Sequence, residues 1–108
     1  MIDFVLKKGD KLPVLRAVFL NDGGSPMNIS GCSILFKYKL REDDSLIISR
    51  TAIVEDPLNG IAQYVWTTED TSSLGVYIGE FIITFPSGKE VTFPEDTYLV
   101  FEVIDNIS

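Results

Sequence analysis

The sequence predicts an all-β protein, an antiparallel β-sandwich of about seven or eight strands that spans residues 1–108 as a single domain. Two observations predict this fold. Short runs of β-branched and aromatic residues alternate with polar residues at period two, and turn residues separate the runs. The apolar stripe of period 3.6 that marks an amphipathic helix is missing.

The N-terminal third is expected to hold two strands and a turn. The strands cover Phe4 to Leu6 and Leu12 to Leu20, and Pro13 favours an edge position or a strand start because proline cannot donate to a strand ladder. The interval Asn21-Asp22-Gly23-Gly24 then reverses the chain, since Asn and Gly tolerate the backbone angles of tight turns. Asn28 to Gly31 leads into the next strand.

The third strand, Cys32 to Leu40, has the clearest inside–outside pattern. Its inward side chains are expected to be Ile34, Phe36 and Tyr38. Leu35 is an apolar exception on the outer side. Cys32 is in phase with the inward residues, which predicts a small buried side chain. With this single cysteine and no histidine, the chain cannot form an internal disulfide or the usual zinc sites.

The central strands follow a charged turn at Arg41 to Asp44. One strand is expected over Leu46 to Val54 and another over Ile61 to Thr67. Asn59-Gly60 lies between them and predicts a hairpin, because both residues tolerate positive φ.

The C-terminal third predicts three more strands, Val76 to Phe85, Glu90 to Phe93 and Tyr98 to Ile104. Their inward residues are expected to be Tyr77, Phe81, Ile83, Phe85, Leu99, Phe101 and Val103. Gly79 interrupts this face and leaves room for a bulky neighbour, for which Trp66 is the candidate.

Tyr77 refines the fold class. It follows a polar loop, Thr68 to Ser73, and stands near the start of a late strand. This is the position of the tyrosine corner, in which the phenol hydrogen-bonds back to the preceding turn of immunoglobulin-like domains. The sequence therefore predicts an immunoglobulin-like sandwich, with a Tyr77 that is simply part of the core as the alternative.

Charge and composition argue against several functions. The 9 Lys and Arg against 16 Asp and Glu give a net charge of −7, which repels nucleic acid and anionic membranes. No histidine and no GxSxG, SxxK or P-loop pattern is present, so we predict no enzyme, no catalytic residue and no cofactor. Asp22-Gly23-Gly24 and Glu42-Asp43-Asp44 lack the ligand spacing of a calcium loop, and no metal residue is assigned.

Three aromatic residues leave a binding function open. Tyr64, Trp66 and Tyr98 would suit a sugar-binding or nucleobase platform if their rings were exposed. Their neighbours in strand phase are apolar, which favours core packing, and an outward Tyr64 would instead mark a protein interface.

The order and spacing of several short motifs resemble the N-terminal domain of the baseplate upper protein family, from tailed phages of Gram-positive bacteria. The resemblance covers nearly the whole chain. The motifs are Gly9-Asp10, Asp22-Gly23-Gly24 followed by Met27-Asn28-Ile29-Ser30-Gly31-Cys32-Ser33-Ile34-Leu35-Phe36, Gly60-Ile61-Ala62-Gln63-Tyr64, Gly75-Val76-Tyr77-Ile78-Gly79-Glu80-Phe81 and Thr92-Phe93-Pro94. The resemblance implies an immunoglobulin-like domain that docks a receptor-binding or side-fibre assembly onto the baseplate.

We therefore predict a structural interaction module of a bacteriophage or prophage tail. Its partners would be other tail or baseplate proteins, and it would form homo-oligomers in multiples of three within the virion after synthesis in the bacterial host cytoplasm. No nucleic-acid or membrane partner is expected. Two alternatives remain: a carbohydrate-binding module for host cell-wall glycans, and a small acidic inhibitor of a host defence protein.

Overall fold

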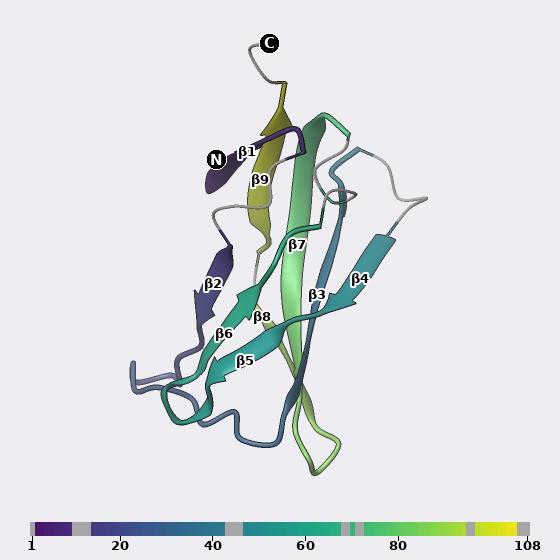
Figure 1. Cartoon of the computed structure of the whole chain (residues 1–108). Helices are drawn as coiled ribbons and strands as arrows, with labels where there is room; N and C mark the ends of the chain where they lie inside the picture. The colour runs from purple at the N-terminus through teal and green to yellow at the C-terminus, as the bar shows by residue number, and fades with distance from the viewer. Residues whose placement is uncertain are drawn as a thin grey trace.

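The computed structural model describes residues 2–9, 14–42, 47–67, 70, 73–94 and 97–105. These residues form nine strands in two sheets and one 3-10 turn (Figure 1). The elements are β1 (Phe4–Lys7), β2 (Leu15–Val18), β3 (Ser33–Leu40), β4 (Ile47–Thr51), β5 (Ile53–Asp56), η1 (Pro57–Asn59), β6 (Ile61–Tyr64), β7 (Gly75–Thr84), β8 (Glu90–Phe93) and β9 (Leu99–Ile104). The all-β prediction is confirmed.

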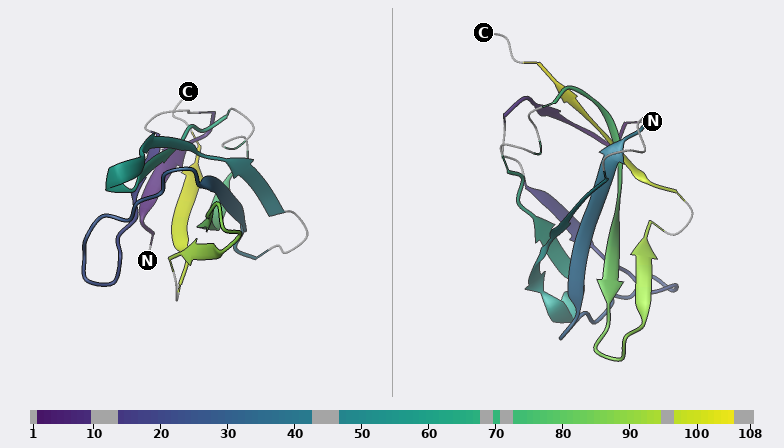
Figure 2. Two further views of the ribbon diagram at one scale, coloured as in Figure 1. Left: turned by 90° about the horizontal axis from the view of Figure 1, so that it is seen from below. Right: turned by 90° about the vertical axis from the view of Figure 1, so that its right-hand side faces the viewer.

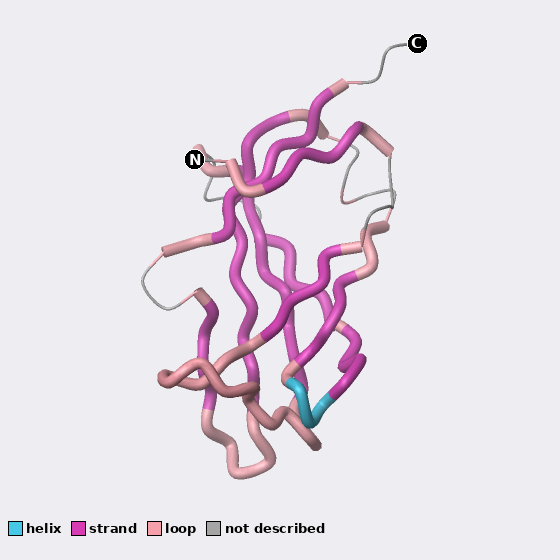
Figure 3. Tube along the Cα trace, turned by 90° about the vertical axis from the view of Figure 1, so that its left-hand side faces the viewer, coloured by secondary structure: helices cyan, strands magenta, loops and turns pink. Residues whose placement is uncertain are grey.

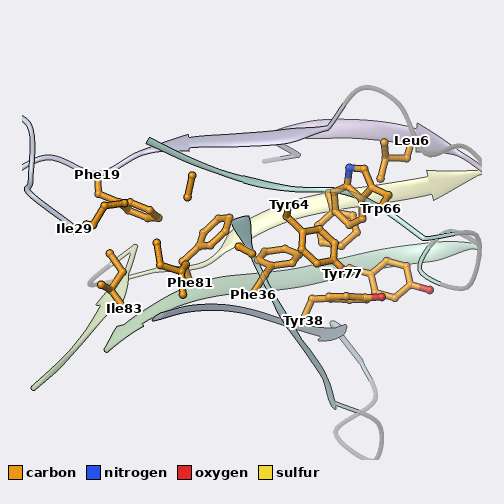
Figure 4. Close-up of a cluster of buried hydrophobic side chains, with 14 of the residues drawn as sticks. Leu6, Phe19, Ile29, Phe36, Tyr38, Tyr64, Trp66, Tyr77, Phe81 and Ile83 are labelled. Carbon is orange, nitrogen blue, oxygen red and sulfur yellow. The ribbon is translucent and has the colours of Figure 1, made fainter. Parts of the chain in front are cut away.

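The larger sheet has six strands in the order β1-β9-β7-β3-β4, with β8 also paired to β7. The smaller sheet has three, in the order β2-β6-β5. The period-two alternation of each strand turns one set of side chains into the space between the sheets, where Figure 4 shows the aromatic rings packed together. The largest fully buried side chains are Trp66, Tyr38, Phe36, Phe81, Phe101, Ile29, Ile34, Ile83 and Val103.

The expected single strand over Leu46 to Val54 is wrong. Leu46 lies outside the described residues, and the rest forms β4 in the large sheet and β5 in the small sheet. Ala52 stands between them, buried, with its N–H bonded to the carbonyl of Ile34 at 2.8 Å. This division of one apolar run is why nine strands appear where fewer were expected.

The expectation of a purely antiparallel sandwich is also wrong. Strand β1 pairs with β9 in parallel, with Phe4 opposite Phe101 and Leu6 opposite Val103. The Phe4 and Phe101 rings stack with centroids 5.2 Å apart. Strand β1 thus pairs with the last strand, β9, and not with β2, the next strand in sequence. The packing of its alternate apolar residues, Phe4 and Leu6, favours this pairing.

Strands β8 and β9 lie along the same edge of β7, one after the other (right panel of Figure 2). Phe93 pairs with Phe81 and Leu99 pairs with Gly79, so Glu80 is the β7 residue that lies between the two ladders. Tyr98 lies before β9, which begins one residue later than expected and covers Leu99–Ile104.

The turn predictions hold in most respects. The Asn21 to Gly24 interval reverses the chain, with the Gly24 N–H bonded to the Asn21 carbonyl at 2.9 Å. The β5–β6 hairpin also forms, but through η1, and only Gly60 takes a positive φ there, at 68°. Strand β2 is shorter than the expected Leu12 to Leu20, and Pro13 lies outside the described residues.

Candidate interaction surfaces

Tyr77 occupies the predicted tyrosine corner. Its hydroxyl donates to the carbonyl of Ser73 at 2.8 Å, and its ring is buried. Burial raises the pKa of the Tyr77 hydroxyl because the charged phenolate would lose its hydration. The residue is therefore both core and corner, and it anchors Ser73 ahead of β7.

The three aromatic residues proposed as a platform do not come together. Trp66 is 1% exposed and Tyr64 is 2% exposed, and their rings lie edge to face in the core, 5.1 Å apart. Tyr98 is 51% exposed and lies on the far side of the large sheet. The bulky side chain nearest to Gly79 is Phe36, because a Cβ at Gly79 would meet the Phe36 ring at 2.9 Å. Core packing, the favoured alternative, is confirmed for Trp66 and Tyr64.

Cys32 is partly buried and packs against the core, close to its predicted place. Burial raises the pKa of its thiol.

Asp22 and Glu42 are exposed in turns, and Asp43 and Asp44 lie outside the described residues. No three Asp, Glu, Cys or His side chains converge within the described ranges. No helix among those residues has the length and apolarity needed to cross a membrane.

A buried carboxylate that the sequence did not predict, Asp70, links both sheets. Its oxygens accept hydrogen bonds from the hydroxyl of Tyr38 on β3, from the hydroxyl of Tyr64 on β6 at 2.7 Å, and from the N–H of Thr67 at 2.7 Å. The Arg50 Nε on β4 stands 3.3 Å from the carboxylate and supplies an opposite charge. Asp70 therefore joins Thr67 and β6 to strands β3 and β4 of the large sheet.

The same cluster changes the acidity of its tyrosines. Burial raises the pKa of Tyr38 and of Tyr64 well above the ordinary tyrosine value, and the hydrogen bond that each donates to Asp70 raises it further. A sequence signal for Asp70 was weak, because it stands in a Ser/Thr/Asp loop where acidic residues are usually solvated.

The outer face of the large sheet is the side turned away from the core. Alternate residues of β7 are buried, so the residues between them point outward. Apolar side chains on this face form cross-strand neighbours: Leu35 stands opposite Ile82, and Ile78 opposite Val100. Leu35, Ile47, Tyr98 and Val5 on this face are each more than one-third exposed. The face therefore presents several apolar side chains to a partner, which is a feature of interaction surfaces.

Charged residues divide this apolar face. Lys37 on β3 stands directly opposite Glu80 on β7, a pairing of opposite charges that stabilises a sheet. A shallow hollow of about 140 Å³ lies beside this pair. It is lined by Lys37, Tyr38, Lys39, Ile47, Ile78, Glu80 and Tyr98. Tyr98, which precedes β9, thus adds an exposed phenol ring to this surface.

Comparison with known proteins gives one family and one fold. Residues 5–106 match the sequence profile described as the BppU N-terminal domain. No curated protein sequence matches the chain. Among solved structures, the chain is similar to the N-terminal domain of ORF48 from phage TP901-1, with 18% sequence identity and a TM-score of 0.59. That match covers 96% of this chain and 84% of the other, and at this identity it supports the fold.

Proposed function

The chain belongs to the family of BppU (baseplate upper protein) N-terminal domains, and from this premise we propose that it docks a receptor-binding or fibre assembly onto a phage baseplate by protein–protein contacts. It is a baseplate component of the virion and acts as a structural module. The outer face of the large sheet makes the contact.

The apolar character of that outer face supports the proposal most directly. Leu35 and Ile82 form one apolar pair and Ile78 and Val100 form another, with the Lys37–Glu80 pair between them. A partner surface with matching positions would bury the two apolar pairs. Its own charged groups would meet the Lys37–Glu80 pair and so fix its position on the sheet.

The finer features of the proposal rest on the fold. We propose that residues 1–108 act as one immunoglobulin-like module, supported by the two sheets and by the Tyr77 corner. In the particle the module forms homo-oligomers in multiples of three and carries out no catalysis. These features follow the family's expected role in a symmetric baseplate.

The first experiment measures the copy number of this chain in purified particles by quantitative mass spectrometry. A fixed multiple of three relative to known tail proteins would support the proposal. Absence of the chain from particles would refute it.

A second experiment tests the outer face with a matched pair of substitutions. Ile47→Asp places a charge on the outer face of the large sheet, and Ile53→Asp places one on the small sheet, at sites that are 56% and 53% exposed. We expect Ile47→Asp to weaken co-purification with baseplate proteins by about tenfold or more, because a charge is desolvated in an apolar contact, and Ile53→Asp to leave it unchanged. Equal effects of the two substitutions would refute the assignment of this face.

A further inference from the structure

Within the part of the chain that the structure describes, strand β2 has an open edge. Among the described strands it pairs only with β6, and its four residues lie at the end of the small sheet. The Phe19 N–H donates to the Gly60 carbonyl at 2.8 Å, and these two residues are the next pair after Val18 and Ile61 in the β2–β6 ladder. In an antiparallel ladder, alternate residues bond to the same neighbour. Leu15 and Ala17 therefore bond toward β6, and the backbone groups of Arg16 and Val18 point away from it.

An apolar groove of about 330 Å³ runs beside this edge. Figure 3 views the molecule from the side on which β2 lies in Figure 1. The groove is lined by Leu15, Arg16, Ala17, Val18, Phe19, Phe81, Phe93, Pro94 and Leu99. It opens between the β2 edge of the small sheet and the β8–β9 side of the large sheet, and the core residues Phe19 and Phe81 take part in its lining.

The parallel pairing of β1 explains why this groove is open. Strand β1 is paired to β9 over Phe101–Ile104 and does not reach Leu99 or β8. By pairing with β9 it also leaves β2 without an outer neighbour among the described strands. The fold thus combines backbone groups that no described strand pairs with and an adjacent apolar groove, which are the two requirements for adding a strand.

We propose that the β2 edge and its groove accept an extended segment of a partner protein as a fourth strand of the small sheet. The segment has apolar side chains at alternate positions, which enter the groove, and Lys or Arg on the other side. Backbone hydrogen bonds to Arg16 and Val18 supply affinity, and the groove selects the side chains. This rests on the proposed function only in taking the partner to be another baseplate protein.

Charge favours a basic segment over a second copy of this chain. The net charge of −7 attracts a Lys- or Arg-bearing segment and repels another copy. The charged residue lining the groove, Arg16, is already paired with Glu55 at 2.8 Å. Two β2 edges of four residues each would also be far too short for the roughly 1,200 Å² of a stable protein interface.

The test uses a fluorescent synthetic peptide of about seven residues that alternates valine and lysine, and measures its binding by fluorescence polarisation. We expect saturable binding that a peptide of the same composition in scrambled order does not show. Methylating the peptide nitrogens along one edge should abolish binding, and methylating those along the other edge should not, because only one edge pairs with β2.

Two substitutions test the location of the site. Val18→Pro removes an N–H that the β2–β6 ladder does not use, a position at which an edge strand tolerates proline, and should weaken peptide binding about tenfold or more. Val18→Thr keeps the N–H and should bind as the wild type does. Leu99→Lys places a charge in the groove and should also weaken binding. Thermal melts of each variant report whether it is folded.

The outcomes separate this proposal from the proposed function. Unchanged binding to folded Val18→Pro, or equal binding of both methylated peptides, would refute the strand site. A wild-type dimer that Val18→Pro abolishes would also refute it, because the occupant would then be a second copy. Loss of peptide binding in a variant that still co-purifies with baseplate proteins supports the strand site and leaves the outer-face contact intact.

Discussion

Asp70 shows how one polar residue can organise an apolar interior. Its carboxylate receives hydrogen bonds from two tyrosine hydroxyls of different sheets and from the backbone of its own loop. The nearby Arg50 balances its charge. A buried carboxylate is stable when its lone pairs are satisfied in this way, so the cluster ties the two sheets together through Tyr38 and Tyr64.

Replacing Asp70 with Asn should destabilise the protein by about 3 kcal/mol, because the charge that balances Arg50 is lost and an amide donor faces the tyrosine hydroxyls. Urea unfolding followed by Trp66 fluorescence measures the change. Asp22→Asn, at an exposed turn, is the matched control and should change stability by less than about 0.5 kcal/mol. Equal stabilities of the two variants would contradict the central role of Asp70.

The raised pKa values of Tyr38 and Tyr64 predict a stability that declines at alkaline pH. Unfolded tyrosine ionises near about pH 10, whereas the fold keeps both phenols protonated above that value. Stability should thus be constant up to about pH 10 and then fall by about 1.4 kcal/mol per pH unit for each such tyrosine. Urea melts from pH 8 to 11 measure the slope. Tyr64→Phe should reduce the slope, and an unchanged slope in this variant would contradict the prediction.

Individual core residues were predictable because burial follows strand phase. Ile34, Phe36, Tyr77 and Phe101 are all buried as their alternation indicates. The burial of Asp70 was not predictable. Its partners come from strands that are distant in sequence, and a single acidic residue in a polar loop belongs to no period-two alternation that would indicate burial.

At the scale of the element, the path through Ala52 determines how the two sheets are connected. Ile48 on β4 and Val54 on β5 both lie on the more buried side of their strands, as Ala52 does. The period-two phase is therefore continuous across the point where the chain changes sheets. For this reason the sequence predicted one strand: alternation indicates which face is buried, and says nothing about which neighbour the backbone pairs with.

The β5–β6 connection depends on Gly60. A Cβ there would lie 2.6 Å from the Phe19 carbonyl oxygen and 2.7 Å from that of Met27, at a φ of 68°. Gly60→Ala should therefore cost about 3 kcal/mol of stability, from backbone strain and displaced carbonyls. Gly88→Ala is the matched control, since Gly88 has a φ of 94° and open space at its Cβ, and should cost only about 1 kcal/mol. Thermal unfolding gives both values, and equal losses would contradict the steric argument.

For the whole molecule, charge repulsion and exposed apolar surface act in opposite directions. The net charge of −7 keeps copies apart near neutral pH, while both the outer face and the β2 groove expose apolar side chains. The fold class and the family were predictable from the order of strands and turns. The two surfaces were not, because the outer face depends on which strands lie side by side and the β2 groove depends on which strand becomes an edge.

This balance predicts self-association close to the isoelectric point of about 4.4. At that pH the repulsion between copies vanishes and the apolar surfaces can meet. Dynamic light scattering should show larger particles at pH 4.4 than at pH 7 at equal protein concentration. Ile47→Asp and Val18→Asp together should reduce the effect. A monodisperse wild-type protein at pH 4.4 would contradict the prediction.

The parallel pairing of β1 with β9 has a mechanical consequence. The two strands run in the same direction, joined by a ladder from Phe4–Phe101 to Lys7–Ile104 and by the bond between the Asp3 N–H and the Val100 carbonyl at 2.7 Å. A force that pulls residue 2 and residue 105 apart acts along both strands in opposite directions and loads all these hydrogen bonds at once in shear. An antiparallel terminal pair pulled from the same end would open one bond at a time. The first and last strands therefore form a clamp that resists tension applied to these two residues.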